Sequence, residues 1–239
     1  LLPPPSPPQC THRTLHRRRS MCLCHQTPTL PIGYFMAKRV IKLIHNVAAV
    51  VNADDRLSKF LKVVFIPNYN VKLAEVMIPA NDISQHISTA GTEASGTSNM
   101  KFAMNGGLIV GTLDGANVEI KEAVGEDQMF IFGLKTDEIE AARHSVVFSA
   151  HASKDAATVD TSAMWASVPD TDPRWIEVLR LLESPSQLFG TTADMQPILQ
   201  SLTPAADRYC LAQDFASYLD AMDRAMQLYT DQGEWARRS

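Results

Sequence analysis

Glycines and short apolar runs alternate over residues 91–133, and this arrangement constrains the fold more than any other feature of the chain. Eight of the eleven glycines lie in this window. The pattern predicts strands at 108–112 and 129–132, and helices near 98–105 and 115–123. Strands and helices that alternate at this spacing build βαβ units, so we expect an α/β protein with a doubly wound parallel sheet. Ligand-binding loops of such sheets lie at the carboxyl ends of the strands.

The segment before this window carries helical and strand patterns of its own. Apolar residues recur at helical spacing over 34–51. The β-branched run at 61–66 predicts a buried parallel strand. A short helix is expected at 71–77, and the chain is expected to return to the sheet at 86–89.

The segment after the window is predicted to be mainly helical. Periodicity is lost over 144–172, which we interpret as a loop or insertion. Pro173 then opens a helix, and a second amphipathic helix covers 214–230 with Asp214 as the candidate N-cap. We therefore expect carboxyl-terminal helices over 173–239.

Residues 1–31 differ in composition from the rest of the chain. They hold seven of the fourteen prolines, three of the four cysteines, four basic residues and no acidic residue. This composition predicts a disordered or non-native leader, with a transit peptide as the alternative, although such peptides are rich in serine and this segment has two. Cys22-x-Cys24, with His25 and Cys10 nearby, supplies only half of a zinc motif, so no metal site is predicted.

Charge and hydropathy exclude two broad classes of protein. The formal net charge of −4 argues against a dedicated nucleic-acid-binding protein. No apolar run approaches the roughly 18 residues that a transmembrane helix needs, so no membrane span is expected. Cys210 is the one cysteine outside residues 1–31, which argues against a disulfide framework and for a reducing compartment.

The run Gly-Thr-Glu-Ala-Ser-Gly-Thr-Ser-Asn-Met-Lys over residues 91–101 has the chemistry of a phosphate site. Its small residues lead into a predicted helix, whose free backbone N–H groups attract an anion. The hydroxyls of Ser95, Thr97 and Ser98 add donors. The run is not a P-loop, because it lacks the Gly-Lys-Ser/Thr ending.

Lys101 lies about one turn inside this predicted helix and is followed by Phe102 and Ala103. Burial among apolar neighbours would lower the pKa of such a lysine, and a neutral amine can form a Schiff base with an aldehyde. A phosphate cradle beside a desolvated lysine is a pyridoxal-phosphate arrangement. The alternative is a solvent-facing helix lysine, the common situation for this residue type.

A second glycine cluster extends from Gly106 to Asn117. Gly106 and Gly107 are expected to end the helix that contains Lys101, and a strand follows them. Asp114 is the candidate cap of the next helix. The backbone of this tight turn could approach a ligand.

Taken together, these residues resemble the α-glucan phosphorylases, the family of glycogen and starch phosphorylases. The block from Glu93 to Phe102 is the most specific part, and the resemblance covers 32–143 without an evident gap and 173–237 more loosely. Asn70 and Ser98 are closer to starch-type members than to animal ones. The matching stretches are Gly33-Tyr34-x-Met36-Ala37-Lys38, Asn68-Tyr69-Asn70-Val71, residues 87–102 and residues 111–120.

The resemblance implies a fold and an activity. The family has a two-domain fold of the GT-B glycosyltransferase type, and this chain matches part of its carboxyl-terminal domain, a Rossmann-like sheet with helices after it. Residues 32–143 would be the cofactor-binding α/β part. The reaction is reversible transfer of a glucosyl unit from an α-1,4-glucan to phosphate, giving glucose 1-phosphate. The family is usually homodimeric.

The resemblance also implies roles for individual residues. Pyridoxal 5'-phosphate would be held as a Schiff base by Lys101, and its phosphate takes part in proton transfer. Thr97 and Ser98 match residues that border this phosphate, and Tyr69 matches an aromatic residue beside the cofactor. The glucosyl hydroxyls would be contacted by Glu93, Ser95 and Gly96, so Lys101 and Glu93 are the candidate catalytic residues.

The departures from the family pattern are as informative as the matches. The family's amino-terminal domain, its glycine-rich loop and the cationic cluster that binds the substrate phosphate have no counterpart in this chain. We therefore expect a piece of a phosphorylase without measurable phosphorolysis of its own, in the cytoplasm or the plastid stroma rather than secreted. The alternatives are a non-catalytic module that binds pyridoxal phosphate and, from pattern alone, half of a nucleotide-sugar glycosyltransferase.

Overall fold

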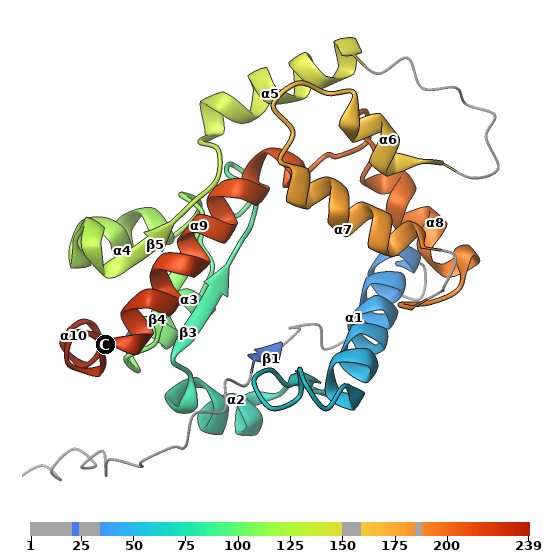
Figure 1. The fold of residues 1–239 in the computed structure, drawn as a ribbon. Helices are drawn as coiled ribbons and strands as arrows, with labels where there is room; N and C mark the ends of the chain where they lie inside the picture. Colours follow the sequence, from blue (N-terminus) through green and yellow to red (C-terminus); the bar gives the residue numbers. More distant parts are fainter. Residues whose placement is uncertain (1–20, 24–33, 150–158, 185–187) are drawn as a thin grey trace, which may run out of the picture.

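The computed structural model describes residues 21–23, 34–149, 159–184 and 188–239, and it places an α/β protein in which helices surround small parallel sheets (Figure 1). In chain order the elements, with η for 3-10 helices, are β1 (Met21–Leu23), α1 (Phe35–Ala53), β2 (Val63–Phe65), α2 (Val71–Met77), η1 (Ile78–Ala80), β3 (Ile83–His86), α3 (Ser98–Ala103), β4 (Leu108–Gly111), α4 (Asn117–Val124), η2 (Glu126–Gln128), β5 (Met129–Ile131), α5 (Thr136–Ser149), α6 (Thr161–Ala166), α7 (Pro173–Glu183), α8 (Thr192–Ser201), α9 (Leu211–Thr230) and α10 (Gln232–Arg238). None of the helices in the described ranges has the length and apolarity to span a bilayer.

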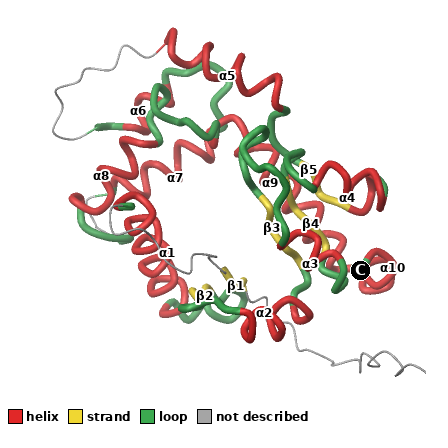
Figure 2. Tube along the Cα trace, turned by 180° about the vertical axis from the view of Figure 1, so that it is seen from behind, coloured by secondary structure: helices red, strands yellow, loops and turns green. Residues whose placement is uncertain are grey.

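The described strands form two parallel sheets (Figure 2). In the larger sheet β4 lies between β3 and β5, with Ile83 opposite Leu108 and Ile109 opposite Met129. In the smaller sheet β1 pairs with β2, with Met21 opposite Val63. All pairings are parallel, as the alternation of strands and helices predicts.

The parallel strand predicted at 61–66 is present as the shorter β2, but it is not part of the larger sheet and is not buried throughout. Only Val63 of β2 is buried, and Val64 is 47% exposed, so little apolar surface holds this strand against the larger sheet. The β2 strand pairs with β1 instead. The prediction that residues 1–31 are a disordered leader is therefore wrong for Met21–Leu23. Of the cysteine motif, Cys22 lies in β1, whereas Cys10, Cys24, His25 and the rest of that leader lie outside the described residues.

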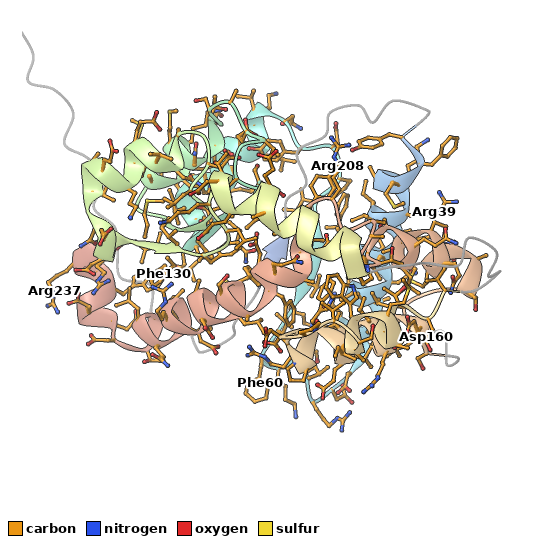
Figure 3. The ribbon with its side chains drawn as sticks, turned by 90° about the horizontal axis from the view of Figure 1, so that it is seen from above. Arg39, Phe60, Phe130, Asp160, Arg208 and Arg237 are labelled. Atoms are coloured by element: carbon orange, nitrogen blue, oxygen red, sulfur yellow. The ribbon has the colours of Figure 1, made fainter. Side chains whose placement is uncertain are left out.

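Helices cover both faces of the larger sheet. On one face Leu108, Val110 and Phe130 form a buried cluster with Ala221 and Ala225 of α9. Figure 3 shows Phe130 inside this layer, whereas Phe60, at 65% exposure, lies at the edge of the molecule.

The alternation of side chains along β3 identifies the two faces. Gln85 accepts a hydrogen bond from the hydroxyl of Tyr218 in α9, at 3.1 Å. The next residue, His86, places its ring 5.9 Å from the ring of Phe102 in α3. Because successive strand residues point to opposite faces, α9 and α3 lie on opposite faces of the sheet.

A second apolar cluster joins the helices that lie away from the sheet. Trp165 of α6, Trp175 and Leu179 of α7, and Ile198 and Leu199 of α8 are buried together. The Trp165 indole donates to the Leu202 carbonyl at 2.6 Å, so its buried N–H is satisfied.

This helical cluster corrects the interpretation of 144–172 as a loop or insertion. The segment contains α6 and the end of α5, because Asp160 caps α6 by accepting from the Ala163 N–H at 2.8 Å and Trp165 anchors it in the core. Helix α5 was not predicted, whereas α8 and α10 lie within 173–239, where helices were expected without individual bounds. The return to the sheet comes three residues earlier than expected, at Ile83–His86.

The amino-terminal end of α9 differs from the prediction that Asp214 caps it. The N-cap is Cys210, in a left-handed backbone conformation. Asp214 lies inside the helix and accepts a hydrogen bond from the Leu134 N–H at 2.8 Å, which ties α9 to the loop after β5. Burial raises the pKa of Asp214 to about 6, opposed by the Leu134 N–H and reinforced by the charge of Asp207.

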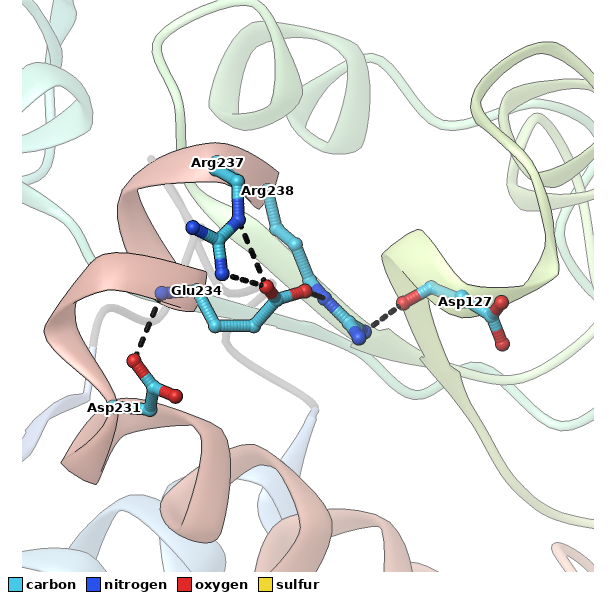
Figure 4. A network of polar contacts seen from close by, with 5 residues as sticks. All are labelled: Asp127, Asp231, Glu234, Arg237 and Arg238. Carbon is cyan, nitrogen blue, oxygen red and sulfur yellow. Dashed lines mark hydrogen bonds and ion pairs between the residues drawn. The ribbon is translucent and has the colours of Figure 1, made fainter.

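An ionic network fixes the last helix, α10 (Figure 4). Glu234 accepts hydrogen bonds from both Arg237 and Arg238. Arg238 also donates to the backbone carbonyl of Asp127 in η2. Asp231 caps the helix by accepting from the Glu234 N–H at 2.9 Å, so α10 is tied to the edge of the larger sheet.

Leu179→Ala tests the helical core. Leu179 is 0% exposed, so the substitution should lower the free energy of unfolding by about 2–5 kcal/mol. Leu181→Ala, two residues along the same helix at 52% exposure, should change it by less than about 0.5 kcal/mol. Urea unfolding followed by circular dichroism measures both, and equal losses would contradict this core.

Asp214 should make stability depend on pH. The folded pKa of Asp214, about 6, exceeds the ordinary 3.8, so the folded state binds this proton more tightly than the unfolded state. The stability that protonated Asp214 contributes is complete below pH 3.8 and is lost as the pH rises through about 6. Between pH 4 and pH 7, the free energy of unfolding of Asp214→Asn should therefore rise by up to about 3 kcal/mol relative to that of the unchanged chain, at about 1.4 kcal/mol per pKa unit.

Unfolding by urea at a series of pH values measures this difference. The matched control is Asp223→Asn, an exposed aspartate on the same helix. A stability difference for Asp214→Asn that does not change with pH would contradict the raised pKa.

Candidate functional site

Two loops meet at the carboxyl edge of the larger sheet. One runs from the end of β3 at His86 to the start of α3 and contains the predicted residues Glu93, Ser95 and Gly96. The other is the turn that connects β4 to α4. Because neighbouring parallel strands end at the same edge, these two loops lie side by side.

The Asp114 carboxylate binds three consecutive backbone N–H groups of the first loop. Its Oδ1 accepts from Gly91 at 2.9 Å, and its Oδ2 accepts from Thr92 at 3.3 Å and from Glu93 at 2.8 Å. Asp114 is 8% exposed, and the three bonds compensate for the burial of its carboxylate. The prediction that Asp114 caps the next helix is wrong, because the N-cap of α4 is Ala116.

The two loops also touch backbone to backbone. The Ala116 N–H donates to the Ser95 carbonyl at 2.6 Å. Gly115 has a φ of +51°, and a Cβ there would lie 2.4 Å from the same carbonyl oxygen. A side chain at position 115 would therefore push the loop away, and glycine is required at this close approach.

A buried pair of asparagines ties the start of α3 to the same turn. Asn99 Nδ2 donates to Asn117 Oδ1 at 2.9 Å. Asn117 Nδ2 donates in turn to the carbonyl of Thr112 at 3.0 Å and to that of His86 at 3.4 Å. The helix that carries Lys101 is thus held through Asn99, two residues before the lysine.

The rest of the first loop keeps its hydrogen-bond donors available. Within the described ranges no group accepts a hydrogen bond from the backbone N–H groups of residues 94–98. The Ser95 hydroxyl donates to the Gly96 carbonyl at 3.2 Å. Thr97 is the N-cap of α3, and its side chain makes no capping bond. The N–H groups of residues 91–93 are already occupied by the Asp114 carboxylate. A ligand would therefore contact the donors from Ala94 to Ser98.

Lys101 and Tyr69 differ from their predicted surroundings. Lys101 is exposed, so the solvent-facing alternative describes it and the prediction of a desolvated lysine is wrong for this chain. Its helix, α3, has six residues, fewer than two turns, and Lys101 faces solvent while Asn99 is buried. Tyr69 is half-buried in the loop after β2, and no hydrogen bond or ring contact joins it to residues 91–101 in the part of the chain that the structure describes.

His86 is a half-buried titratable group that the sequence analysis did not single out. Burial lowers the pKa of His86, and its Nε2 has no hydrogen-bond partner among the described residues. It lies at the end of β3, where the first loop begins. Its position at a strand terminus is the signal that could have identified it.

The donors and charges of the site define what it can bind. Consecutive N–H groups and the hydroxyls of Thr97 and Ser98 suit the oxygens of a phosphate or a sugar. Lys101 adds an amine one turn later, and Glu93 an exposed carboxylate. No group of three potential metal ligands occurs among the described residues.

Comparison with known proteins places the chain in a family. The sequence profile of the carbohydrate phosphorylases matches residues 27–239. Glycogen phosphorylase 2 of Dictyostelium discoideum is 49% identical over 207 residues, which cover 87% of this chain and 19% of that protein.

Two plant proteins are similar over the same part of the chain. Alpha-glucan phosphorylase 2, cytosolic, of Arabidopsis thaliana is 43% identical over 211 residues, or 86% of this chain and 23% of that protein. The chloroplastic/amyloplastic alpha-1,4 glucan phosphorylase L isozyme of Vicia faba is 45% identical over 211 residues, or 86% and 19%. The chain spans about a fifth of the length of these relatives.

Asn117→Ala tests the asparagine pair. The variant removes two buried hydrogen bonds and one partly buried bond, and it leaves the Asn99 amide without its acceptor, so the free energy of unfolding should fall by about 1–3 kcal/mol or more. Asn105→Ala removes one exposed bond to the Lys101 carbonyl and should cost less than about 1 kcal/mol. Urea unfolding compares them, and equal losses would refute the role of the pair.

Proposed function

Because the chain belongs to the carbohydrate phosphorylase family, we propose that it forms the cofactor-binding part of an α-1,4-glucan phosphorylase. The proposed reaction is reversible transfer of a glucosyl unit between an α-1,4-glucan and phosphate, with glucose 1-phosphate as the other partner. We also propose that β3 to β5 belong to a doubly wound, Rossmann-like domain of the GT-B type. Helices on both faces of this parallel sheet support that assignment.

The observation that carries the proposal is the position of Lys101 three residues after the last of a run of free donors. The N–H groups of residues 94–98 and the hydroxyls of Thr97 and Ser98 fit a cofactor phosphate. The exposed amine of Lys101 is accessible to the aldehyde of pyridoxal 5'-phosphate. The residues present therefore fit this cofactor, and Tyr69 is proposed to border it from the loop after β2.

The chain's own residues would bind and orient the substrate. Bound pyridoxal phosphate supplies a phosphate group that can exchange a proton with the substrate phosphate. Glu93, exposed at the tip of the first loop, can accept hydrogen bonds from glucosyl hydroxyls, and Ser95 and Gly96 can offer N–H groups to them. Directed polar contacts of this kind favour the oxocarbenium-like transition state of glucosyl transfer.

The compartment and assembly of the protein are part of the proposal. The relatives include one named cytosolic and one named chloroplastic/amyloplastic, which supports the cytoplasm or the plastid stroma. A homodimer is proposed from the resemblance. A nucleotide-sugar glycosyltransferase half-domain would not trap pyridoxal phosphate, so the experiment below also separates the two activities.

Lys101→Ala tests the cofactor site. After incubation with pyridoxal phosphate and reduction with borohydride, the unchanged chain should carry one pyridoxyl group on Lys101, located by mass spectrometry of its peptides. Lys101→Ala should lose this label, because α3, which begins at the end of the donor run, holds no other lysine. Lys72→Ala, which removes an exposed lysine of α2, should keep it. Labelling that persists in Lys101→Ala would remove Lys101 from the site.

A further inference from the structure

We propose that Asp114 is a positioning residue, whose carboxylate sets the direction in which the loop of residues 91–97 presents its sugar-contacting groups. This inference rests on the proposed function, because it takes the loop's ligand to be a glucosyl unit. Asp114 would not touch the sugar. Its two oxygens are occupied by the N–H groups of Gly91, Thr92 and Glu93.

The geometry of these bonds gives Asp114 control over Glu93. The shortest of the three, at 2.8 Å, ends on the backbone N–H of Glu93 itself. Three consecutive bonds to one carboxylate fix the backbone over the three residues, and so fix the direction of the Glu93 Cα–Cβ bond. A charged acceptor makes such bonds stronger than neutral ones.

The base from which Asp114 acts is rigid. The residue follows β4, whose four residues are all buried, and its own N–H bonds the Thr112 carbonyl at 3.0 Å. The Thr112 hydroxyl donates to the Ser88 carbonyl at 2.6 Å, which ties the turn to the beginning of the same loop. The loop is therefore held in place by the turn after the central strand of the sheet, not by contacts at the protein surface.

Lys101 is positioned from the same turn by a separate route. Its helix is held by Asn99 and Asn117, and neither residue bonds the loop of residues 91–93. The turn between β4 and α4 thus holds the loop of residues 91–97 through Asp114 and helix α3 through Asn117. This separation allows an experiment to disturb one and leave the other.

Asp114→Asn is the direct test, made on this chain by residue-resolved amide hydrogen exchange. The amide keeps one acceptor oxygen and turns an NH2 group toward N–H donors, so either Gly91 or Glu93 loses its acceptor. The Thr92 N–H keeps the Thr89 carbonyl, at 3.1 Å. Exchange at the residue that loses its acceptor should rise about tenfold or more. Exchange in β4 and α9 and pyridoxyl labelling of Lys101 should stay within about twofold, as in the control Asp223→Asn.

A second variant keeps the test decisive if Asp114→Asn does not fold. Gly115→Ala pushes on the Ser95 carbonyl and leaves Asp114 intact. Exchange of the Ala116 N–H should then rise, while Gly91, Thr92 and Glu93 remain protected. Equal rises at both places would show that the loop moves as one unit and that Asp114 is not its anchor.

A ligand measurement separates this inference from the proposed function. Chemical shifts of the Ser95 and Gly96 amides are followed during titration with α-D-glucose and with glucose 1-phosphate. Asp114→Asn should weaken the response by about tenfold. A response unchanged in Asp114→Asn, or exchange that rises equally throughout the sheet, would overturn the positioning role. A lack of response in the unchanged chain would instead overturn the glucosyl assignment, and the anchoring would be judged on exchange alone.

Discussion

The burial of β4 on both faces is the constraint on which the rest of the site depends. All four of its residues are buried between β3 and β5, with α9 on one face and α3 on the other. A strand in this position has a fixed register, because a slip of one residue would exchange its two apolar faces. The turn that follows β4 therefore starts from one defined point, and this fixes the backbone positions of Asp114, Gly115 and Asn117.

The polar groups of this turn form a buried network rather than a set of separate contacts. A carboxylate, two carboxamides and a hydroxyl are each satisfied by backbone or by one another, at Asp114, Asn99, Asn117 and Thr112. Buried networks of this kind specify one arrangement strongly, because every partial rearrangement leaves a polar group without a partner. The adjacent donors of residues 94–98 are then held in place without being used, which is the condition for binding a ligand with little reorganisation.

Local patterns in the sequence predicted much of this architecture, and the long-range contacts account for what they missed. The helices α1 and α2 and the order of strands and helices through β5 follow from periodicity and glycine spacing. Asp114 and Asp214 were both predicted as helix caps, because each stands near a helix start. Each instead accepts N–H groups from a loop that is distant in sequence, by 21 to 23 residues for Asp114 and by 80 for Asp214. Sequence position alone does not indicate such partners, and the same limit applies to the exposure of Lys101, which depends on which side of α3 packs against the sheet.

The contact between Gly115 and the Ser95 carbonyl is made by backbone atoms alone, and this makes the two positions unequal in what substitutions they accept. Position 115 has no room for a side chain, because a Cβ would meet the carbonyl oxygen. Position 95 contributes to the contact only its carbonyl, and its side chain is exposed. A substitution at position 95 can therefore change the exposed surface of the loop while the loop keeps its backbone path. A change in surface chemistry and the preservation of the backbone are thus divided between the two residues of one contact.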